Sequence, residues 1–471
     1  MPGASGTFIS SRQVWWSTLV FICIAAGVTT VFVNPLIIIA ALFLLANVVL
    51  IVKYPFWGLL SYLMIYLLRP GEMYPSLSAL RPELVTGLFV LFVVVIRQKI
   101  IEGKVTLPSD SITLSMVAFL VVMCLTVFTS YDKGRTIETC LDFFKLMIFY
   151  YLIISLIDTK PKFVAFMAVF FLMISYIAFG AFRSYIEGGY ITRMGVDRLY
   201  GSTSAGGDPN TLAATLAATI PIVIASAIYF KQKIVKLALI GLGAFMVLLI
   251  AITASRSGMI AFMGAAVGGF IFTKKKLMVA MAFIILIPIG WMMLPEQYKD
   301  RYRTITEVES NIDETSSGRW HIWKAGMHMI FARPVLGVGA GAFAYAYGSG
   351  EYGPARWMQP HNLYIQCMAE TGIIGFFVWF GVFIRNFAKK LMHLSSLGLA
   401  YSDIYWIRVF SIGFLISMIT LAISGMFSHN LYRYTWYLMA GLTVVLDKFT
   451  SDYMKDKEIE IENIPQAQEA V

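Results

Sequence analysis

The chain has 471 residues, of which 58% are hydrophobic and only 14% are charged; its mean hydropathy is +0.74. An ordinary soluble domain carries charge on roughly a quarter of its residues, so this composition excludes a soluble globular enzyme, a disordered chain and a secreted disulfide scaffold. The net charge of +10 indicates the basic inner loops of a membrane protein, since the sequence contains neither a soluble basic domain nor a nucleic-acid recognition motif. The four cysteines are scattered without a CxxC pair and are expected to fill space between helices.

The apolar residues fall into about 14 windows of membrane-spanning length, so we predict an all-α polytopic membrane bundle of about 12 to 14 transmembrane helices. The windows cover residues 14–33, 35–52, 55–68, 83–97, 112–129, 142–157, 162–182, 210–230, 234–252, 256–273, 277–294, 361–386, 404–426 and 430–447. The first window is too long for the apolar region of a signal peptide, and no small-residue cleavage motif follows it, so we expect a spanning helix.

Lysines and arginines between the windows set the expected orientation. If the N-terminus is cytoplasmic and the windows alternate, the inner loops collect Lys53, Arg97, Lys99, Lys104, Lys160, Lys162, Lys231, Lys233, Lys236, Lys274, Lys275, Lys276, Arg385, Lys389 and Lys390. Cytoplasmic loops carry such an excess of positive charge, so both ends of the chain are expected in the cytoplasm. The predicted divisions are N-terminal transmembrane helices at 1–209, central helices at 210–294, an outer loop at 295–360, C-terminal helices at 361–448 and a solvated, disordered tail at 449–471.

Two outer segments carry cations that orientation does not require. They are Arg183, Arg193 and Arg198 in the first segment, and Lys299, Arg301, Arg303, Arg319, Lys324, Arg333 and Arg356 in the second. Guanidinium groups pair with phosphate oxygens through parallel hydrogen bonds, so an anionic ligand such as a diphosphate would explain this set. Contacts with outer-leaflet head groups and local ion pairs are the alternative explanation.

Two short polar breaks flank the central helices on the expected outer side. Residues 201–210 predict a tight loop of small residues, in which Asn210 either caps the next helix or contacts substrate. Arg256 lies in the second break, residues 253–258, between two apolar helices. An arginine so close to the bilayer is costly unless it is paired, reaches the interface or faces a wet cavity. Small residues on both sides would let a bulky ligand approach, so we favour a functional cation over one that only reaches the interface.

The segment 316–343 predicts an amphipathic helix followed by a glycine-rich loop. Trp320, Trp323, Met327 and Ile330 recur at helical spacing, as on a helix that lies at the membrane interface.

Arg319 is expected near the N-terminus of that helix, where the helix dipole also favours anions. The alternate glycines of residues 337–341 are expected to form a flexible loop. That loop is not a phosphate-binding P-loop, because Gly-Lys-Ser/Thr is missing and no strand precedes it. His321 and His328 could share a helix face, but a metal site between them is the less favoured interpretation.

Polar residues open the next spanning helix. Asn362, Gln366 and Glu370 are spaced i, i+4 and i+8, so they form one stripe that descends into the membrane. A glutamate at that depth is expensive and indicates either a lined cavity or a buried network. His361 stands at the mouth of the stripe, on the cationic side of the membrane. A neutral imidazole there could accept a proton from a sugar hydroxyl near neutral pH, so we predict a general base or an orienting residue.

Motifs for metal binding are missing from the sequence. It contains no HExxH, no paired His/Cys spacing and no Asp-x-Asp in an outer loop. A bound Mg²⁺ would normally neutralise a leaving diphosphate, and arginines that do this instead would let an enzyme work without a metal. We therefore predict neither a metal site nor a cofactor.

Together these motifs resemble the O-antigen ligase/polymerase superfamily. The resemblance rests on Ser255-Arg256-Ser257-Gly258, Gly318-Arg319-Trp320, Pro334 with Gly337 and Gly339, His361-Asn362, and Glu370-x-Gly372. It covers residues 200–470 well, whereas the first 200 residues match only as a bundle of apolar helices. The order and spacing of the motifs around one long outer loop make the set specific.

The resemblance implies an enzyme of the bacterial inner membrane, similar to the lipid A-core:surface polymer ligases, with a GT-C-like bundle and an active site that faces the periplasm. Members transfer a glycan from undecaprenyl diphosphate to an acceptor hydroxyl by a metal-independent, inverting mechanism. The functional arginines and histidine of the family correspond to Arg256, Arg319 and His361, which are the expected catalytic residues. The residues expected to contact substrate are Arg198, Asn210, Arg301, Arg303, Trp320, Asn362 and Gln366.

Several acceptors remain open from the sequence. Ligases of the family attach O antigen to lipid A-core, polymerases extend a second lipid-linked repeat, and relatives glycosylate proteins. We favour lipid A-core, and we expect membrane lipids but no nucleic acid as further partners. A transporter of anionic lipids or sugars is a more distant alternative, because transporters often consist of two related halves, whereas here the polar motifs gather in one outer loop and its flanks.

Overall fold

The computed structural model describes residues 35–462, except for residues 104, 106–107, 194, 202–206, 274, 278–279, 282–283, 285–291, 293–295 and 304–313. The chain divides into an N-terminal unit, residues 1–58, and a large unit, residues 59–471. The N-terminal unit contains α2 (Pro35–Lys53), an apolar helix of 19 residues. The predicted helix at 14–33 and most of the one at 277–294 lie outside the described residues.

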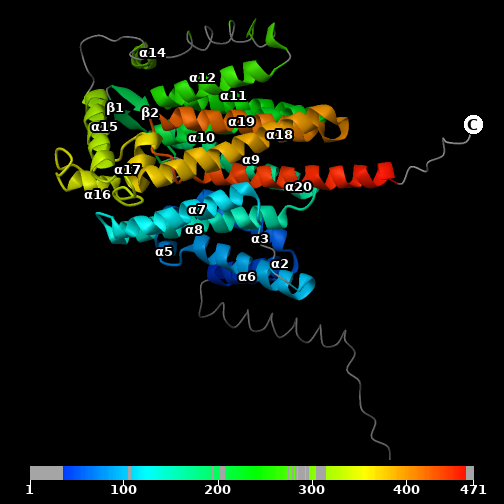
Figure 1. Cartoon of the computed structure of the whole chain (residues 1–471). Coiled ribbons are helices and arrows are strands. Elements are labelled where there is room, and N and C mark those ends of the chain that lie inside the picture. Colours follow the sequence, from blue (N-terminus) through cyan, green and yellow to red (C-terminus); the bar gives the residue numbers. More distant parts are fainter. Residues whose placement is uncertain are drawn as a thin grey trace, which may run out of the picture. The chain divides into compact units, whose positions relative to one another are not determined.

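Helices form nearly all of the described part of the large unit, as the apolar windows predict (Figure 1). The long ones are α6 (Pro82–Glu102), α7 (Ser111–Leu125), α8 (Lys133–Leu156), α9 (Lys160–Ile186), α10 (Pro209–Tyr229), α11 (Lys233–Ile252), α12 (Arg256–Phe272), α17 (Leu363–Phe376), α18 (Arg385–Ala400), α19 (Tyr405–Gly425) and α20 (Tyr434–Glu462). In the described residues, eight helical segments are long and apolar enough to cross a membrane. The predicted all-α polytopic fold is confirmed.

Helix α10 is the most deeply buried of these segments, and small residues explain how it is enclosed. Its first half is rich in Ala and Thr, and the helix packs against α11, α12 and α19. Small residues let neighbouring helices of a membrane bundle approach closely. On α19, a Cβ at Gly413 would lie only 2.8 Å from the Cβ of Ala225, so glycine is required at this crossing. Ser417 of α19 also donates a hydrogen bond to the Ala218 carbonyl of α10.

Two segments are more helical than the sequence predicted. The chain continues from α17 through the π-helix η2 (Phe377–Ile384) into α18, so the loop expected after residue 386 is helix. Phe387, Leu391 and Leu394 are buried along α18, and this apolar face holds the helix to the bundle. The tail expected to be disordered from residue 449 instead continues α20 as far as Glu462, because its Lys and Glu residues favour helix.

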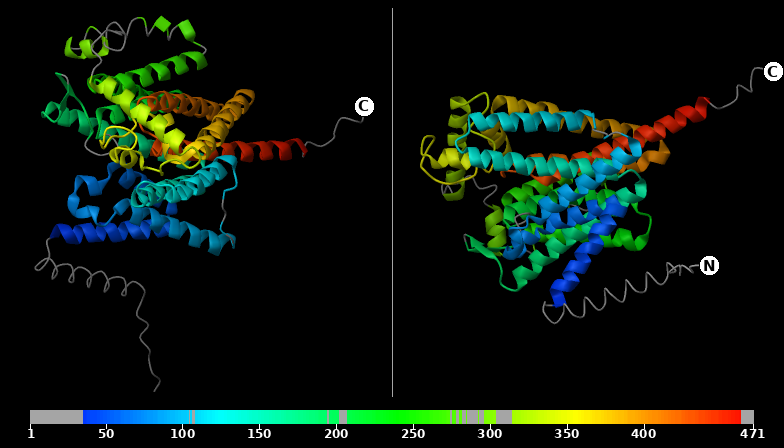
Figure 2. Two further views of the ribbon diagram at one scale, coloured as in Figure 1. Left: turned by 60° about the vertical axis from the view of Figure 1, so that its left-hand side comes forward. Right: turned by 90° about the horizontal axis from the view of Figure 1, so that it is seen from below.

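The segments predicted to be outer loops gather at one end of the long helices of the large unit (Figures 1 and 2). They include α15 (Glu314–Ala332), α16 (Phe343–Gly348) and a hairpin of β1 (Ile191–Arg193) and β2 (Val196–Arg198). We call this the outer end. The hairpin pairs Ile191 with Arg198, and the sequence analysis had missed it. Helices α9 and α11 begin with lysines at the opposite end, in agreement with the charge pattern.

The glycine-rich segment 337–341 is buried rather than flexible, which corrects the prediction. The amide of Val338 donates to the Ala369 carbonyl at 2.8 Å, and the amide of Gly339 donates to the Glu370 carbonyl at 3.1 Å. A Cβ at Gly339 would clash with Ser130, and one at Gly341 would clash with Thr139. The glycines therefore let the chain pass between α8 and α17, and close packing explains them better than mobility does.

Candidate functional site

His361 lies at the outer end, directly before the residue that caps α17. Its φ of +45° is a left-handed conformation, which costs a residue with a Cβ roughly 1–2 kcal/mol. Surrounding contacts must enforce such a conformation. Trp323 of α15 provides one, since its indole Nε1 donates to the Pro360 carbonyl at 2.9 Å. The backbone that carries the half-buried His361 is thereby held beside α15.

Asn362, expected to contact substrate, has a structural task in this conformation. Its Oδ1 caps α17 by accepting hydrogen bonds from the amides of Tyr364 at 2.9 Å and Ile365 at 3.1 Å. Its Nδ2 donates to the Met426 carbonyl at 3.1 Å. The side chain therefore joins the start of α17 to the loop between α19 and α20.

The polar stripe below His361 is a buried network, one of the two interpretations left open by the sequence. Glu370 Oε2 accepts hydrogen bonds from the Gly341 amide at 2.9 Å and from the Tyr432 hydroxyl at 2.8 Å. Gln366, another expected substrate contact, is buried here, with its Nε2 3.5 Å from Glu370 Oε1. The network braces α17, the glycine-rich segment and the α19–α20 loop against one another.

His429 is a site residue that the sequence analysis missed. It lies in the α19–α20 loop, and its ring centroid is 5.0 Å from that of His361, with an angle of 68° between the planes. The His429 side chain is exposed to solvent along one side, and the protein packed around the rest of the ring, together with His361 and Arg433, lowers its pKa to about 4. His429 is therefore neutral at physiological pH, and its edge-to-face contact helps to fix the ring of His361.

Arg433, four residues along the same loop, was also missed. Its Nη2 donates to the Thr211 carbonyl in the first turn of α10 at 3.2 Å. Burial lowers the pKa of its guanidinium, and the nearby carboxylate of Asp208 offsets this in part. Asp208 in turn caps α10 by accepting from the Thr211 amide at 3.0 Å. The outer end thus contains a further arginine, in addition to the predicted site residues Arg256 and Arg319.

The corner between the hairpin, α10 and α12 is rigid. Arg198 is only 2% exposed; its Nε donates to the Thr253 carbonyl at 2.8 Å and its Nη2 donates to Asn210 Oδ1 at 3.1 Å. Ser255 Oγ donates to the same Asn210 oxygen at 2.7 Å. Arg198 and Asn210 were both predicted to contact substrate. In the structure, their side-chain atoms make hydrogen bonds to other groups of the protein. The cap of α10 is Asp208 rather than Asn210, because Asp208 precedes the helix and Asn210 lies within its first turn.

Arg256 is the first residue of α12, immediately after that corner. Ser255 caps the helix by accepting from the Gly258 amide at 3.1 Å, and Ala254 turns the chain with a φ of +47°. These contacts fix the backbone that carries the half-buried Arg256 side chain at the outer end. The N-terminus of α12 adds its own positive potential at this position.

Arg319 lies on α15 one turn before Trp323, so the two side chains share a helix face. Because Trp323 contacts the peptide next to His361, the half-buried Arg319 lies on the side of α15 toward the same site. Trp320, predicted to contact substrate, is 67% exposed. The face of α15 that packs inward consists of Ile322, Ala325 and Met329, whereas Trp320 and Met327 of the predicted interfacial stripe are exposed.

Arg301 and Arg303 occur at the end of α14 (Glu296–Arg303), and their side chains lie outside the described part of the structure. The helix itself is anchored beside the Arg256 corner. Tyr298 packs with Val196 and Ala254, and its hydroxyl donates to the Asp197 carbonyl at 2.5 Å. Both arginines are therefore carried by a helix that begins at this corner.

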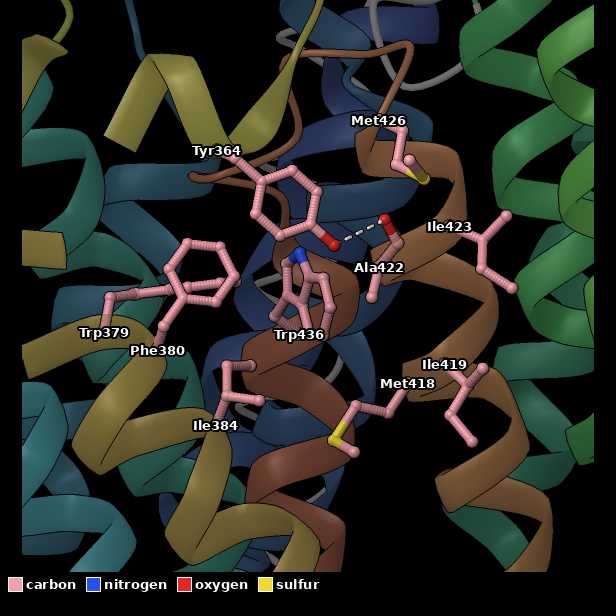
Figure 3. Close-up of a pocket in the computed structure, with 10 residues that line it drawn as sticks. All are labelled: Tyr364, Trp379, Phe380, Ile384, Met418, Ile419, Ala422, Ile423, Met426 and Trp436. Atoms are coloured by element: carbon pink, nitrogen blue, oxygen red, sulfur yellow. Dashed lines mark hydrogen bonds between the residues drawn. The ribbon is translucent and has the colours of Figure 1, made fainter. Parts of the chain in front are cut away.

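An apolar cavity of about 170 Å³ lies between α17–η2, α19 and α20 (Figure 3). Trp379 of η2, Trp436 of α20 and Met426 are in its wall, and the Tyr364 hydroxyl donates to the Ala422 carbonyl at 3.2 Å. The carbonyl of Met426 also accepts the hydrogen bond from Asn362, the residue that follows His361. The cavity therefore adjoins the start of α17, where His361 lies. We call it the α19–α20 cavity.

The outer end therefore combines cations, helix N-termini and a histidine pair. Such a set can bind a polyanion and accept a proton at adjacent positions. In the described residues, no three His, Cys, Asp or Glu side chains are grouped as metal ligands.

Comparison with known proteins agrees with the sequence resemblance. Residues 241–380 match the family model described as O-Antigen ligase. The match contains Arg256, Arg319 and His361 and ends within η2. A comparison with curated proteins finds no match.

Proposed function

We propose that this member of the O-antigen ligase superfamily transfers a glycan from undecaprenyl diphosphate to an acceptor hydroxyl at the periplasmic face of the bacterial inner membrane. Its family supports a glycan-transferring role in general. One observation carries the finer proposal: Arg256, Arg319 and His361, which are far apart in the chain, are borne by elements that meet at the outer end.

The arginines would bind the donor. Arg256 and Arg319 pair with oxygens of the diphosphate and stabilise the negative charge that grows as this group leaves. The N-termini of α10 and α12 meet at the same corner and favour the same charge. The donor is already activated by its diphosphate, so the reaction needs no nucleotide.

His361 would act on the acceptor. The acceptor oxygen attacks the anomeric carbon of the donor glycan while the bond from that carbon to the diphosphate oxygen breaks. His361 takes the hydroxyl proton, and undecaprenyl diphosphate leaves with the electron pair. Attack from the face opposite the leaving group inverts the anomeric carbon.

The α19–α20 cavity offers a place for the first isoprenoid units of the donor. Its wall is formed by aromatic and aliphatic side chains, and it adjoins the helix start that carries His361. A diphosphate at the outer end and a chain that descends along the cavity would place the anomeric carbon at the membrane boundary. Apolar contact of this kind favours the lipid without constraining the glycan.

A transfer assay tests the function. Purified protein in lipid nanodiscs is incubated with a synthetic undecaprenyl diphosphate-linked glycan and with lipid A-core, a second lipid-linked glycan or an acceptor protein, and covalent product is scored. We expect product with lipid A-core, and we expect it to persist in EDTA because arginines neutralise the leaving group. Transport of the lipid without a covalent product would exclude the enzyme, and a requirement for added Mg²⁺ would exclude the arginine mechanism.

Deletion of the gene shows which acceptor the enzyme uses in cells. Loss of all O antigen with an intact core on a polysaccharide gel supports ligation to lipid A-core. A product with a single repeat supports polymerisation instead.

A further inference from the structure

Among the described residues, Arg433 is the cation of the outer end that has a buried donor atom without an acceptor. Its guanidinium makes one hydrogen bond to a protein group among the described residues, from Nη2 to the Thr211 carbonyl at 3.2 Å. Within the described part of the chain, no carboxylate lies within ion-pair distance of it. Its Nη1 is buried and has no acceptor there.

A buried, unpaired donor on a charged group is expensive. Leaving such a donor unsatisfied costs the free energy of its desolvation, and this cost is larger when the group is charged. A native structure that retains one often has a catalytic role or an unseen ion or water at that place. Arg333 differs from Arg433 because the protein itself provides partners for its guanidinium. The Arg333 side chain donates to the Thr129 carbonyl, and its guanidinium lies 4.6 Å from the ring centroid of Tyr131.

The surroundings of Arg433 favour an anion. Asp208, the carboxylate that acts on it electrostatically, is committed to capping α10 through the Thr211 amide. His429 is within electrostatic reach of both Arg433 and His361. The guanidinium therefore lies between the N-terminus of α10, whose dipole favours an anion, and the histidine pair.

We infer that Arg433 binds a phosphate oxygen of the lipid-linked diphosphate through Nη1, as a third guanidinium beside Arg256 and Arg319. This inference rests on the proposed function for the identity of the anion. Arg433 also precedes α20 and lies one turn before Trp436, which lines the α19–α20 cavity. It is therefore the arginine best placed to hold the phosphate that is attached to the lipid.

Direct binding tests this role without relying on turnover. Full-length protein in nanodiscs is titrated with undecaprenyl diphosphate, which carries no glycan, and with undecaprenol, which carries no phosphate. Arg433→Met should weaken diphosphate binding by about 10- to 100-fold, as expected when a hydrogen bond to a charged group is lost. Undecaprenol binding should stay unchanged. Arg333→Met, which removes an arginine of the outer end whose contacts are already made, should leave both affinities near those of the wild type.

Other outcomes would contradict the inference. Equal loss of both ligands would show that Arg433 only packs the loop, and unchanged diphosphate affinity would show that Nη1 is satisfied by water. If Arg433→Met does not fold, Arg433→Lys keeps a donor for the Thr211 carbonyl but lacks the planar fork; it should fold and still lose diphosphate affinity. The wild-type protein could bind the diphosphate in a way that depends on Arg433 and yet transfer no glycan. That result would support the Arg433 site and contradict the proposed reaction.

Discussion

The imidazole rings of His361 and His429 meet edge to face, with centroids 5.0 Å apart, although they come from the start of α17 and from the α19–α20 loop. The two rings have different surroundings. His361 follows the peptide held by Trp323, whereas His429 lies close to Arg433 and has a pKa of about 4. A histidine with so low a pKa is a weak base, so the proposed mechanism uses His361 rather than His429 for proton abstraction.

His361→Ala should abolish glycan transfer while the protein remains inserted and folded, because the variant lacks the imidazole that the proposed mechanism uses to take the acceptor proton. The measurement is the nanodisc transfer assay combined with thermal unfolding of the same preparation. His328→Ala is the control on the same side of the protein, since His328 is exposed on α15. Near-normal turnover of His361→Ala with an inactive His328→Ala would move the base to α15.

The stability of the outer end should depend on the protonation of His429. Its pKa is lowered from 6.5 to about 4 in the folded protein by desolvation, His361 and Arg433. Between these values the unfolded state binds more protons, so the contribution to stability is complete above pH 6.5 and is lost as the pH falls toward 4. The melting temperature of the wild type in detergent should therefore fall more steeply over this range than that of His429→Gln. Parallel curves would show that His429 is freely protonated.

Arg256→Lys and Arg319→Lys should each reduce the transfer rate by about 10²–10³, because lysine keeps the charge but loses the fork that contacts two phosphate oxygens. Initial rates at saturating donor report this loss. Arg183→Lys is the matched control, since Arg183 is an outer-end arginine whose exposed side chain is paired with Glu187 at 2.8 Å. Wild-type rates for both Arg256→Lys and Arg319→Lys would remove these arginines from the diphosphate site.

Local patterns predicted the parts of the site that begin helices. Arg256 was recognisable because a polar break interrupts two apolar runs, and His361 because a polar stripe follows it at helical spacing. The structure places both at helix starts, as the spacing predicts. Their catalytic roles stay predictions.

The parts of the site that could not be predicted depend on packing between segments that are far apart in the sequence. His429 and Arg433 occupy a loop of a few residues, and their partners are His361, just before α17, and Thr211 in the first turn of α10. A His and an Arg in a short outer loop were visible, but nothing local pairs them with distant elements. The glycines of 337–341 were misinterpreted for the same reason, since their neighbours on α8 and α17 are remote in sequence.

The segment around Ser349 should face the periplasm and the one around Lys275 the cytoplasm. Both side chains are exposed, and they belong to the outer end and to the opposite, lysine-rich end. In a background with all four native cysteines replaced, Ser349→Cys should react with a membrane-impermeant thiol reagent in cells with a permeabilised outer membrane. Lys275→Cys should react only after the inner membrane is opened. The reverse pattern would invert the topology and place the site in the cytoplasm.

Gly372→Ala should destabilise the protein and reduce its activity. Gly372 has a φ of +66° inside α17, and a Cβ there would clash with the backbone of Val335 and Leu336. The backbone strain alone costs about 1–3 kcal/mol, and the clash adds to it. Displacing the segment after Pro334 would also withdraw the Gly341 amide from Glu370, and with it the brace below His361.

Gly180→Ala provides the matched comparison for this substitution. Gly180 lies within α9, where an added Cβ meets no atom within 4 Å. Alanine favours helix over glycine by up to about 1 kcal/mol, so this variant should unfold at the same or a higher temperature than the wild type. Both variants are compared by thermal unfolding in detergent and by the rate of glycan transfer. A Gly372→Ala protein as stable as Gly180→Ala would show that segment 334–341 can move away from α17, and the buried brace beneath His361 would then not be rigid.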